Sequence, residues 1–150
     1  MIEIRPIESP DHDQWLPLWL GYNAFYGRFG GAALAPDITT ESWRRLLDPE
    51  EPMWALVAVR DGRLVGLAQY LFHHSTTALA PACYLQDLYI SEDQRGHGIG
   101  RALIEQVYRN ATELGCQSIY WQTHRSNTQA MHLYDKVAEQ SEFLIYRKSS

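Results

Sequence analysis

Apolar residues in the first ninety positions follow, in three places, the period of two that is typical of strands. Residues 2–7 alternate apolar and polar side chains and predict a short first strand. Residues 53–73 read as two strands around Asp61 and Gly62, a pair that favours a tight type I′ turn. Residues 83–90 are rich in aromatic and branched side chains and predict a further strand. The sequence therefore predicts antiparallel pairing around this hairpin.

Two segments between these strands repeat apolar residues at three and four positions, which is the period of a helix. The first segment includes Trp15 and runs to about Tyr26, and Pro17 is tolerable only in the first turn of such a helix. The second follows Thr40, which we expect as its N-cap, with Thr39 as the other choice. Both helices therefore precede the hairpin.

The last third of the chain alternates helices and strands. Residues 101–115 carry one apolar helical stripe, and Gly115 can close that helix. Residues 118–123, 127–137 and 143–147 predict a strand, a helix and a last strand. No repeat or linker interrupts the pattern. We therefore expect one α+β domain over residues 1–150, with a central mixed, mostly antiparallel sheet.

Composition and charge narrow the class of function. Hydrophobic residues at 45% and charged residues at 21% are ordinary for a soluble globular protein, and aromatic residues at 12% favour an aromatic-lined pocket. A net charge of -5 argues against the basic surface of a nucleic-acid-binding protein and suits a cationic amine or a basic peptide. No apolar run is long enough to span a membrane, so we expect no membrane association.

The cysteines and histidines bear on compartment and metal. Cys83 and Cys116 lie in apolar segments and are expected to be buried, reduced thiols, which favours the cytoplasm. The N-terminus lacks the features of a signal peptide. His73 and His74 are adjacent and would point to opposite faces of a strand, so we predict no metal site.

The segment Gln94–Gly100 (QRGHGIG) lies between the strand 83–90 and the helix 101–115. Its three glycines let the backbone turn tightly and gather N–H groups at the helix N-terminus, a point that attracts an anion. Arg95, His97 and Arg101 flank this point, and an arginine can add paired hydrogen bonds to phosphate oxygens. The expected ligand is a pyrophosphate.

Other readings of the same loop fit less well. A dinucleotide-binding fingerprint would require an acidic residue at the end of a second strand about twenty residues on. A Walker loop would require a Lys followed by Ser or Thr. A glycine-softened turn that binds nothing is the alternative that the loop alone leaves open.

The loop and its surroundings together resemble the GCN5-related N-acetyltransferase (GNAT) superfamily. The family's pattern of Gln or Arg, two residues of any kind, Gly, any residue, and Gly or Ala is matched by residues 95–100. DLYI before the loop is similar to the family's fourth strand, WQT to its fifth, and NTQAMHLY to its second coenzyme-contacting helix. RLLDP, PMWALVAV and LIYRK are similar to the fungal histone-and-other-protein and D-amino-acid acetyltransferase group and its bacterial relatives.

The resemblance implies a fold and a co-substrate. The fold would be a sheet of six or seven strands with about four helices, splayed between the fourth and fifth strands, and the co-substrate would be acetyl-CoA. The pantetheine arm would pair with the fourth strand and the pyrophosphate would lie in the loop. The coenzyme-binding residues are then expected to be Leu88, Tyr89, Ile90, Gln94, Arg95, Gly96, His97, Gly98, Ile99, Gly100, Arg101, Asn127 and Tyr134.

Acetyl transfer from a thioester requires a neutral amine, donors for the developing oxyanion and an acid for the departing thiolate. Tyr134 is the candidate acid, because the family implies that role for it. The base is left open. Polyamine-acetylating members carry Glu at the position of Gln86, and a Gln cannot accept a proton. Asp87 points to the opposite strand face and either acts through water or is structural. The candidate catalytic residues are Tyr134, Asp87 and Gln86.

The acceptor side is expected at the first helix and the ends of the central strands. The candidate substrate-binding residues are Tyr22, Tyr26, Tyr84 and His124, of which Tyr84 is expected on the same strand face as Gln86. We expect a small primary amine such as a polyamine, an amino acid or another metabolite. A protein lysine acetyltransferase and a non-catalytic coenzyme A-binding sensor are the alternatives.

The chain departs from the family pattern after the last helix. Residues 138–142 read AEQSE where members commonly have a Gly and an aromatic residue, so the sixth strand is expected to be short or altered. The edge of the last strand, residues 143–147, is expected to pair with a second subunit in a homodimer.

Overall fold

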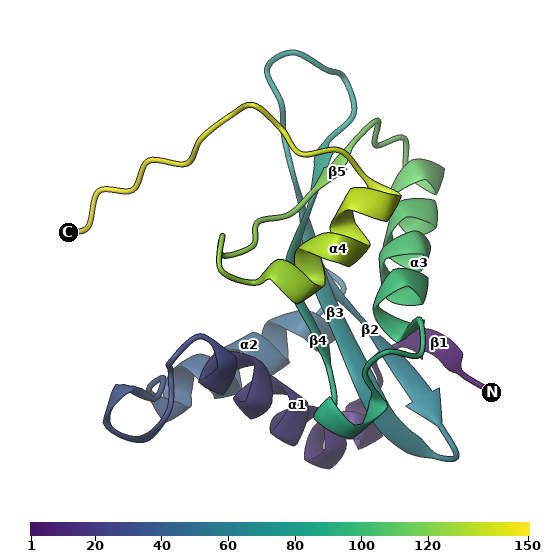
Figure 1. The fold of residues 1–150 in the computed structure, drawn as a ribbon, viewed down its shortest axis with the longest axis vertical. Coiled ribbons are helices and arrows are strands. Elements are labelled where there is room, and N and C mark those ends of the chain that lie inside the picture. Colours follow the sequence, from purple (N-terminus) through teal and green to yellow (C-terminus); the bar gives the residue numbers. More distant parts are fainter.

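The computed structural model describes residues 1–150, which form one five-stranded sheet with helices on both faces (Figure 1). The strand order is β1-β2-β3-β4-β5, in which the first three pairs are antiparallel and the β4–β5 pair is parallel. The strands are β1 (Glu3–Pro6), β2 (Met53–Arg60), β3 (Arg63–His73), β4 (Ala82–Ile90) and β5 (Ile119–Tyr120). The α-helices are α1 (His12–Phe25), α2 (Pro36–Leu47), α3 (Ile99–Glu113) and α4 (Thr128–Val137). This mixed arrangement confirms the predicted fold class.

The sheet separates two hydrophobic cores, and β2 shows how the sequence fills both. Leu56 and Ala58 belong to the core that packs against α3, whereas Ala55 and Val57 belong to the core under α1 and α2. Side chains of a strand alternate between its two faces. The unbroken apolar run in β2 is therefore the mark of a strand that is covered on both sides.

The hairpin between β2 and β3 confirms the predicted turn. Asp61 and Gly62 have φ angles of 51° and 75°, so both residues adopt the left-handed conformation that a type I′ turn requires. Ala58 pairs with Gly66 and Val59 pairs with Leu64, so Val65 is an extra residue in β3 just after the turn. The hairpin fixes the antiparallel register of β2 and β3 beneath the site.

Two predictions about helix starts were wrong. We expected Pro17 in the first turn of its helix, but α1 begins at His12, directly after a 3-10 turn whose capping box joins Glu8 and Asp11, and Pro17 lies inside the helix. We expected Thr40 as a cap, but α2 already begins at Pro36. Proline at the first helical position has the right φ angle and lacks only an N–H that would be unpaired there, so it starts this helix.

β4 contains an irregularity that changes which way its side chains point. Gln69 pairs with Asp87 and Tyr70 pairs with Leu85, so Gln86 is an extra residue in β4. Such a bulge reverses the alternation of side chains beyond it. The bulge puts Asp87 on the α1 face, which is also the face of Tyr84, so the prediction that Asp87 points to the opposite face from Tyr84 was wrong.

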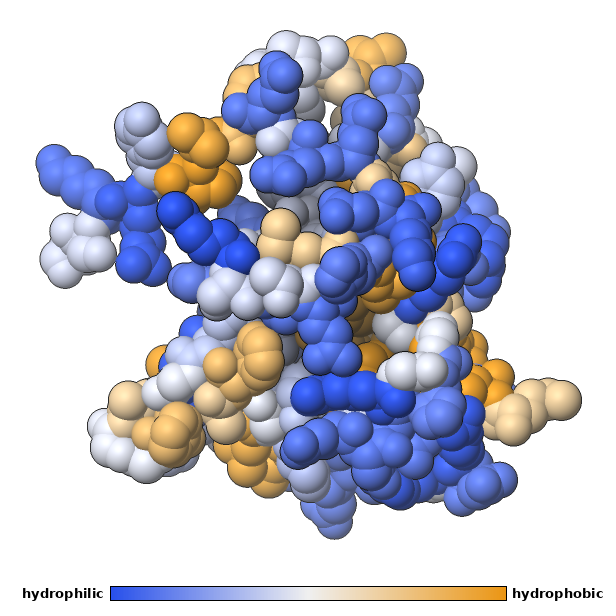
Figure 2. All heavy atoms as spheres, viewed as in Figure 1, coloured by the Kyte–Doolittle hydropathy of each residue, from blue (hydrophilic) through white to orange (hydrophobic).

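The C-terminal part of the sheet is shorter than predicted. β5 has only two residues where residues 118–123 were expected, and residues 143–147 form no strand, so the sheet has five strands instead of six or seven. The tail leads away from the body of the protein, and its side chains are exposed (Figure 2). After α4 the chain offers one strand-like segment, and β5 is too short to pair with it.

Three further features concern the cysteines, the helices and groups of possible metal ligands. Cys83 and Cys116 are both free and buried. None of the helices has the length and apolar character that crossing a membrane requires. No three His, Cys, Asp or Glu side chains are placed together where they could bind a metal ion.

Candidate active site

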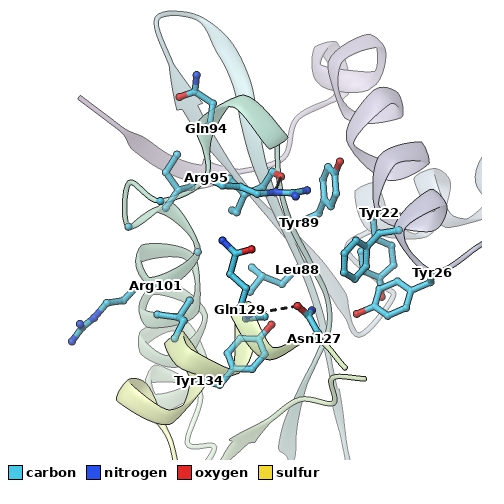
Figure 3. A pocket seen from close by; sticks show the side chains of 18 residues that line it. Tyr22, Tyr26, Leu88, Tyr89, Gln94, Arg95, Arg101, Asn127, Gln129 and Tyr134 are labelled. Atoms are coloured by element: carbon cyan, nitrogen blue, oxygen red, sulfur yellow. Dashed lines mark hydrogen bonds between the residues drawn. The ribbon is translucent and has the colours of Figure 1, made fainter. Parts of the chain in front are cut away.

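A cleft of about 420 Å³ opens where β4 and β5 separate. The two strands pair only at Cys83 with Ile119 and at Tyr84 with Tyr120, so the rest of β4 has no neighbour on that side. α1 forms one wall, α4 and the start of α3 form the other, and β4 forms the floor (Figure 3). The lining residues are Tyr22, Phe25, Tyr26, Leu88, Tyr89, Ile90, Gln94, Arg95, Gly96, Gly98, Ile99, Gly100, Arg101, Asn127, Gln129, Ala130, Leu133 and Tyr134.

The glycine loop presents unpaired backbone donors to this cleft. Gly96 and Gly98 have φ angles of 82° and 79°, which turn the chain sharply into α3. The backbone N–H groups of residues 96–101 donate to no acceptor within the protein. These groups gather at the positive end of the α3 dipole. The loop is therefore built to bind an anion.

Two arginines flank the loop in different ways. Arg95 donates from Nε to the Ile90 carbonyl oxygen at 3.0 Å, and its guanidinium carbon lies 5.4 Å from the ring centre of Tyr89. Arg101 is exposed and bonds to Glu105 one helical turn on, at 3.0 Å. Arg95 is thus held at the cleft by β4, while Arg101 lies at its mouth. His97 is exposed and does not line the cleft.

The start of α4 carries the residues of the opposite wall. Asn127 is the N-cap of the helix, and its Oδ1 accepts a hydrogen bond from the Ala130 N–H at 3.4 Å. Tyr134 lies two turns further on and packs edge-on against Trp121, with ring centres 5.5 Å apart. Its hydroxyl has no hydrogen-bond partner in the protein and points into the cleft (Figure 3). Burial raises the pKa of Tyr134 to about 12.

The open edge of β4 forms the floor between these walls. Backbone N–H and C=O groups of a strand point alternately to its two sides, and the side that faces β5 has no partner beyond Tyr84. Leu88, Tyr89 and Ile90 lie along this open edge and line the cleft. An extended ligand arm can therefore add to the sheet here as a further strand.

A buried hydrogen-bond chain lies beneath the α1 side of the cleft. The Trp15 indole donates to Gln69 Oε1 at 2.8 Å, and Gln69 Nε2 donates to Asp87 Oδ2 at 2.7 Å. All three residues are buried. An indole nitrogen can only donate, so it fixes the orientation of the Gln69 amide. The amide N–H groups are therefore directed at Asp87.

Asp87 is an acidic group in an unfavourable environment for its charge. Burial raises the pKa of this carboxyl, and the Tyr22 hydroxyl, the Gln69 amide and the charge of Arg28 oppose that rise. The Tyr22 hydroxyl donates to the Gln86 carbonyl oxygen at 3.3 Å, so it bridges α1 and the bulge in β4 beside Asp87. Perturbed carboxyls beside a cleft are typical of sites that move protons.

The structure brings most, but not all, of the expected site residues together. Among the candidate acceptor-binding residues, Tyr22 and Tyr26 line the cleft. Tyr84 stacks on Tyr120 with ring centres 4.9 Å apart, just outside it. His124 lies on an exposed loop and bonds to Ser126 at 2.7 Å. Gln86 is exposed at the bulge and does not line the cleft.

Three residues near the site were missed by reading the sequence. Gln129 lines the cleft from the first turn of α4. Trp15 and Gln69 form the chain to Asp87. A polar Gln inside the apolar run of β3 was a signal that one position there has a buried partner. Nothing local connects it to Trp15, which lies 54 positions earlier.

Comparisons with known proteins agree with this geometry. A sequence model of the acetyltransferase (GNAT) family matches residues 13–138. The chain is 34% identical to the D-amino-acid N-acetyltransferase HPA3 of Saccharomyces cerevisiae, over 99% of this chain and 91% of the yeast protein. It is 27% identical to an aminoglycoside N(6′)-acetyltransferase of Stenotrophomonas maltophilia, over 75% of each protein.

A solved structure of similar fold carries a ligand that involves coenzyme A. The aminoglycoside acetyltransferase AAC(6′)-Iy, crystallised with a bisubstrate analogue of coenzyme A, has a TM-score of 0.83 with this protein at 18% identity, over 100% of this chain and 99% of that one. The likeness at this level concerns the fold. Together with the match over residues 13–138 and the yeast relative, it leads to one conclusion. The chain belongs to the GNAT family of acetyltransferases.

Proposed function

We propose that the protein transfers the acetyl group of acetyl-CoA to the primary amine of a small molecule, by direct attack while both substrates are bound. The observation that carries this proposal is the cleft itself. It joins the unpaired N–H groups of residues 96–101 to the open edge of β4 and ends between Tyr134 and the α1 tyrosines. An anion site, a strand-like groove and a polar end occur in the order in which coenzyme A carries its pyrophosphate, its pantetheine arm and its thioester.

The residues present fit this co-substrate. Residues 96–101 and Arg95 would hold the pyrophosphate, and Leu88, Tyr89 and Ile90 would pair with the pantetheine arm through their backbones. Asn127 would contact the same arm from α4. The bound thioester supplies an activated acetyl group. A backbone N–H at Leu88 or Tyr89 would then stabilise the negative charge on the thioester oxygen.

Tyr134 would act on the sulfur as a hydrogen-bond donor. Its pKa of about 12 keeps the phenol protonated throughout the neutral range. An ordinary thiol has a pKa of about 8.5, so complete proton transfer from Tyr134 to a thiolate is uphill by about 5 kcal/mol. A strong hydrogen bond to the departing thiolate is the role that this difference favours, and the proton is then supplied from solvent.

Asp87 would receive the proton of the attacking amine. Gln69 holds Oδ2, so Oδ1 is the atom on which a proton can sit without breaking that hydrogen bond. The raised pKa of Asp87 makes the carboxylate a stronger base than an exposed Asp. Asp87 does not line the cleft, so one water beside Tyr22 would carry the proton from the attacking amine to Asp87.

A small amine is the acceptor that the relatives support. The yeast relative is a D-amino-acid acetyltransferase and the bacterial relative acts on aminoglycosides. Both kinds of acceptor are small and carry an amine.

We also propose that residues 1–150 act as one N-acetyltransferase domain, in the cytoplasm and as a homodimer. The free, buried Cys83 and Cys116 suit a reducing compartment. The side chains of Phe143, Leu144, Ile145 and Tyr146 are 68–92% exposed. Four adjacent apolar residues left in water, beside an unpaired β5 edge, favour burial against a second copy.

The experiment is a thiol-release assay with acetyl-CoA and a panel of small amines, with product masses measured in parallel. We expect acetylated amine and free coenzyme A in equal amounts. Thiol release without an acetylated amine, or acetylation of proteins only, would contradict the proposal.

A further inference from the structure

Arg28, in the turn after α1, is a cation without a carboxylate partner. It forms no ion pair in the structure. Its Nε donates to Asn23 Oδ1 at 2.7 Å, and Asn23, only 3% exposed, donates in turn to the Trp19 carbonyl oxygen at 2.9 Å. One edge of the guanidinium is therefore fixed to the end of α1, while Nη1 and Nη2 have no acceptor within the protein.

This guanidinium lies beside the aromatic wall of the cleft. Its central carbon is 5.8 Å from the ring centre of Tyr22 and 5.4 Å from that of Tyr26. Both rings line the cleft, and in Figure 3 they form the wall opposite Tyr134. The rings stabilise the cation and limit where it can move. Arg28 is thus placed at the acceptor end and not at the coenzyme loop.

Asp87 supplies the opposite charge at the same end. It lies close enough to Arg28 for the cation to oppose the rise that burial causes in the pKa of Asp87, yet the two groups form no ion pair. Tyr22 contacts the bulge of β4 beside Asp87 and also lies under Arg28. One fixed cation and one fixed anion therefore border the same aromatic wall.

We propose that Arg28 determines acceptor specificity by binding a carboxylate of the acceptor, so that the enzyme selects amines that also carry an acid group. The inference rests on the proposed acetyl transfer to small amines. An arginine whose Nη1 and Nη2 groups are both free binds a carboxylate through paired hydrogen bonds along that edge. The amine of the same molecule is then directed to the Asp87 side. A polyamine or an aminoglycoside would place a second positive charge near Arg28 and be repelled.

The test compares matched acceptors that differ only in the carboxylate. Leucine in both enantiomers is compared with 3-methylbutylamine, and lysine with 1,5-diaminopentane, with the wild-type protein at one pH and salt concentration. We expect kcat/KM to be about 10- to 100-fold higher for the acids, the range for a charge-assisted hydrogen bond. Equal or higher kcat/KM for the decarboxylated amines overturns the inference and leaves the acetyltransferase proposal intact. This comparison needs no variant.

The Arg28→Gln variant tests whether Arg28 causes the preference for acceptors that carry a carboxylate. We expect KM for the acids to rise about tenfold or more, while kcat/KM for the decarboxylated amines stays the same or increases. Arg109→Gln is the matched control, since Arg109 is an exposed arginine on α3 that bonds only to Gln106. An equal loss of kcat/KM with the acids and with the decarboxylated amines would show that Arg28 only supports the fold of α1. No acetylation of any amine by the wild type, despite acetyl-CoA binding, would reject the proposed function itself.

Discussion

Two side chains carry most of the chemistry proposed for this site, and their surroundings differ in kind. Tyr134 is a phenol that burial keeps protonated, and it offers a hydrogen bond to the cleft. Asp87 is a carboxyl that burial makes more basic, and it is held by a chain of donors from Trp15 and Gln69. The first environment favours donating a hydrogen bond without losing the proton, and the second favours accepting a proton. This difference separates the two proposed roles at neutral pH.

Removing the Tyr134 hydroxyl tests the first role. Tyr134→Phe should lower kcat about 100-fold, because the leaving thiolate loses its donor, while the affinity for acetyl-CoA and the melting temperature change little. Steady-state kinetics and calorimetric titration check both parts. Tyr108→Phe is the control, since Tyr108 is 53% exposed on α3. Unchanged kcat in Tyr134→Phe would mean that the hydroxyl is not used.

Asp87→Asn tests the second role and has a pH-dependent signature. The folded-state pKa of Asp87 lies above its ordinary value of 3.8, because burial outweighs the opposing groups. Such a group contributes stability that is fully present below the unfolded pKa and is lost as the pH rises through the folded pKa. Asp87→Asn should therefore melt at an equal or higher temperature than the wild type at pH 7, and this advantage should vanish near pH 4. Its kcat should fall about 100-fold.

Calorimetry at the two pH values and kinetics at neutral pH together separate a catalytic from a structural carboxylate. This variant leaves unchanged the titratable and charged side chains that face Asp87, which are Tyr22, Tyr26, Tyr84 and Arg28. Asp37→Asn removes one exposed charge from α2 and serves as the control. A large loss of stability at pH 7 with normal kcat would show that Asp87 serves the fold instead.

The glycine loop and the start of α3 are the element on which co-substrate binding depends. Gly98 has a φ of 79°, and an alanine there adopts this conformation at a cost of about 1 to 2 kcal/mol. Gly98→Ala should lose about this much stability and raise KM for acetyl-CoA about tenfold or more, since the N–H groups of the loop shift. Gly62→Ala is matched to it, because Gly62 has a φ of 75° in the distant hairpin. Denaturant unfolding and kinetics should find the same loss of stability in both variants but a raised KM only in Gly98→Ala. A raised KM in both variants would show that the effect on KM does not come from the loop.

Elements with strong local signals could be predicted from the sequence. The Asp61-Gly62 turn and the apolar stripe of α3 each depend on neighbours in sequence, and both were confirmed. The bulge at Gln86 was missed, because it depends on how β4 pairs with β3. The bulge decides that Asp87 shares a face with Tyr84, so the geometry of the candidate base could not be read from alternation alone.

The predicted last strand does not form, and the reason is physical. Residues 143–147 have the composition of a strand, but a strand requires a partner. β5 offers only Ile119 and Tyr120, and residues 143–147 pair with neither of them. Composition indicates that a segment can pair, whereas the pairing itself depends on what lies beside it. The candidate site does not depend on a last strand, because it is built on β4, which pairs with β3 over its length.

The whole molecule is proposed to be a homodimer that buries this tail. Sedimentation velocity should find a dimer for the full chain and a monomer after removal of residues 143–150. Removal of residues 147–150 alone should leave the dimer, since Phe143, Leu144, Ile145 and Tyr146 remain. A full-length chain that stays monomeric at tens of micromolar would contradict the proposal.

All the proposed roles require that the cleft from Arg95 to Tyr134 binds acetyl-CoA. Thermal unfolding with and without acetyl-CoA measures this binding, with ATP and NAD as comparators that also carry an adenosine with 5′-linked phosphates. At a concentration about 100-fold above Kd, acetyl-CoA should raise the melting temperature by about 5 to 10 °C, and ATP and NAD should leave it unchanged. No rise with acetyl-CoA, or an equal rise with ATP or NAD, would contradict the account.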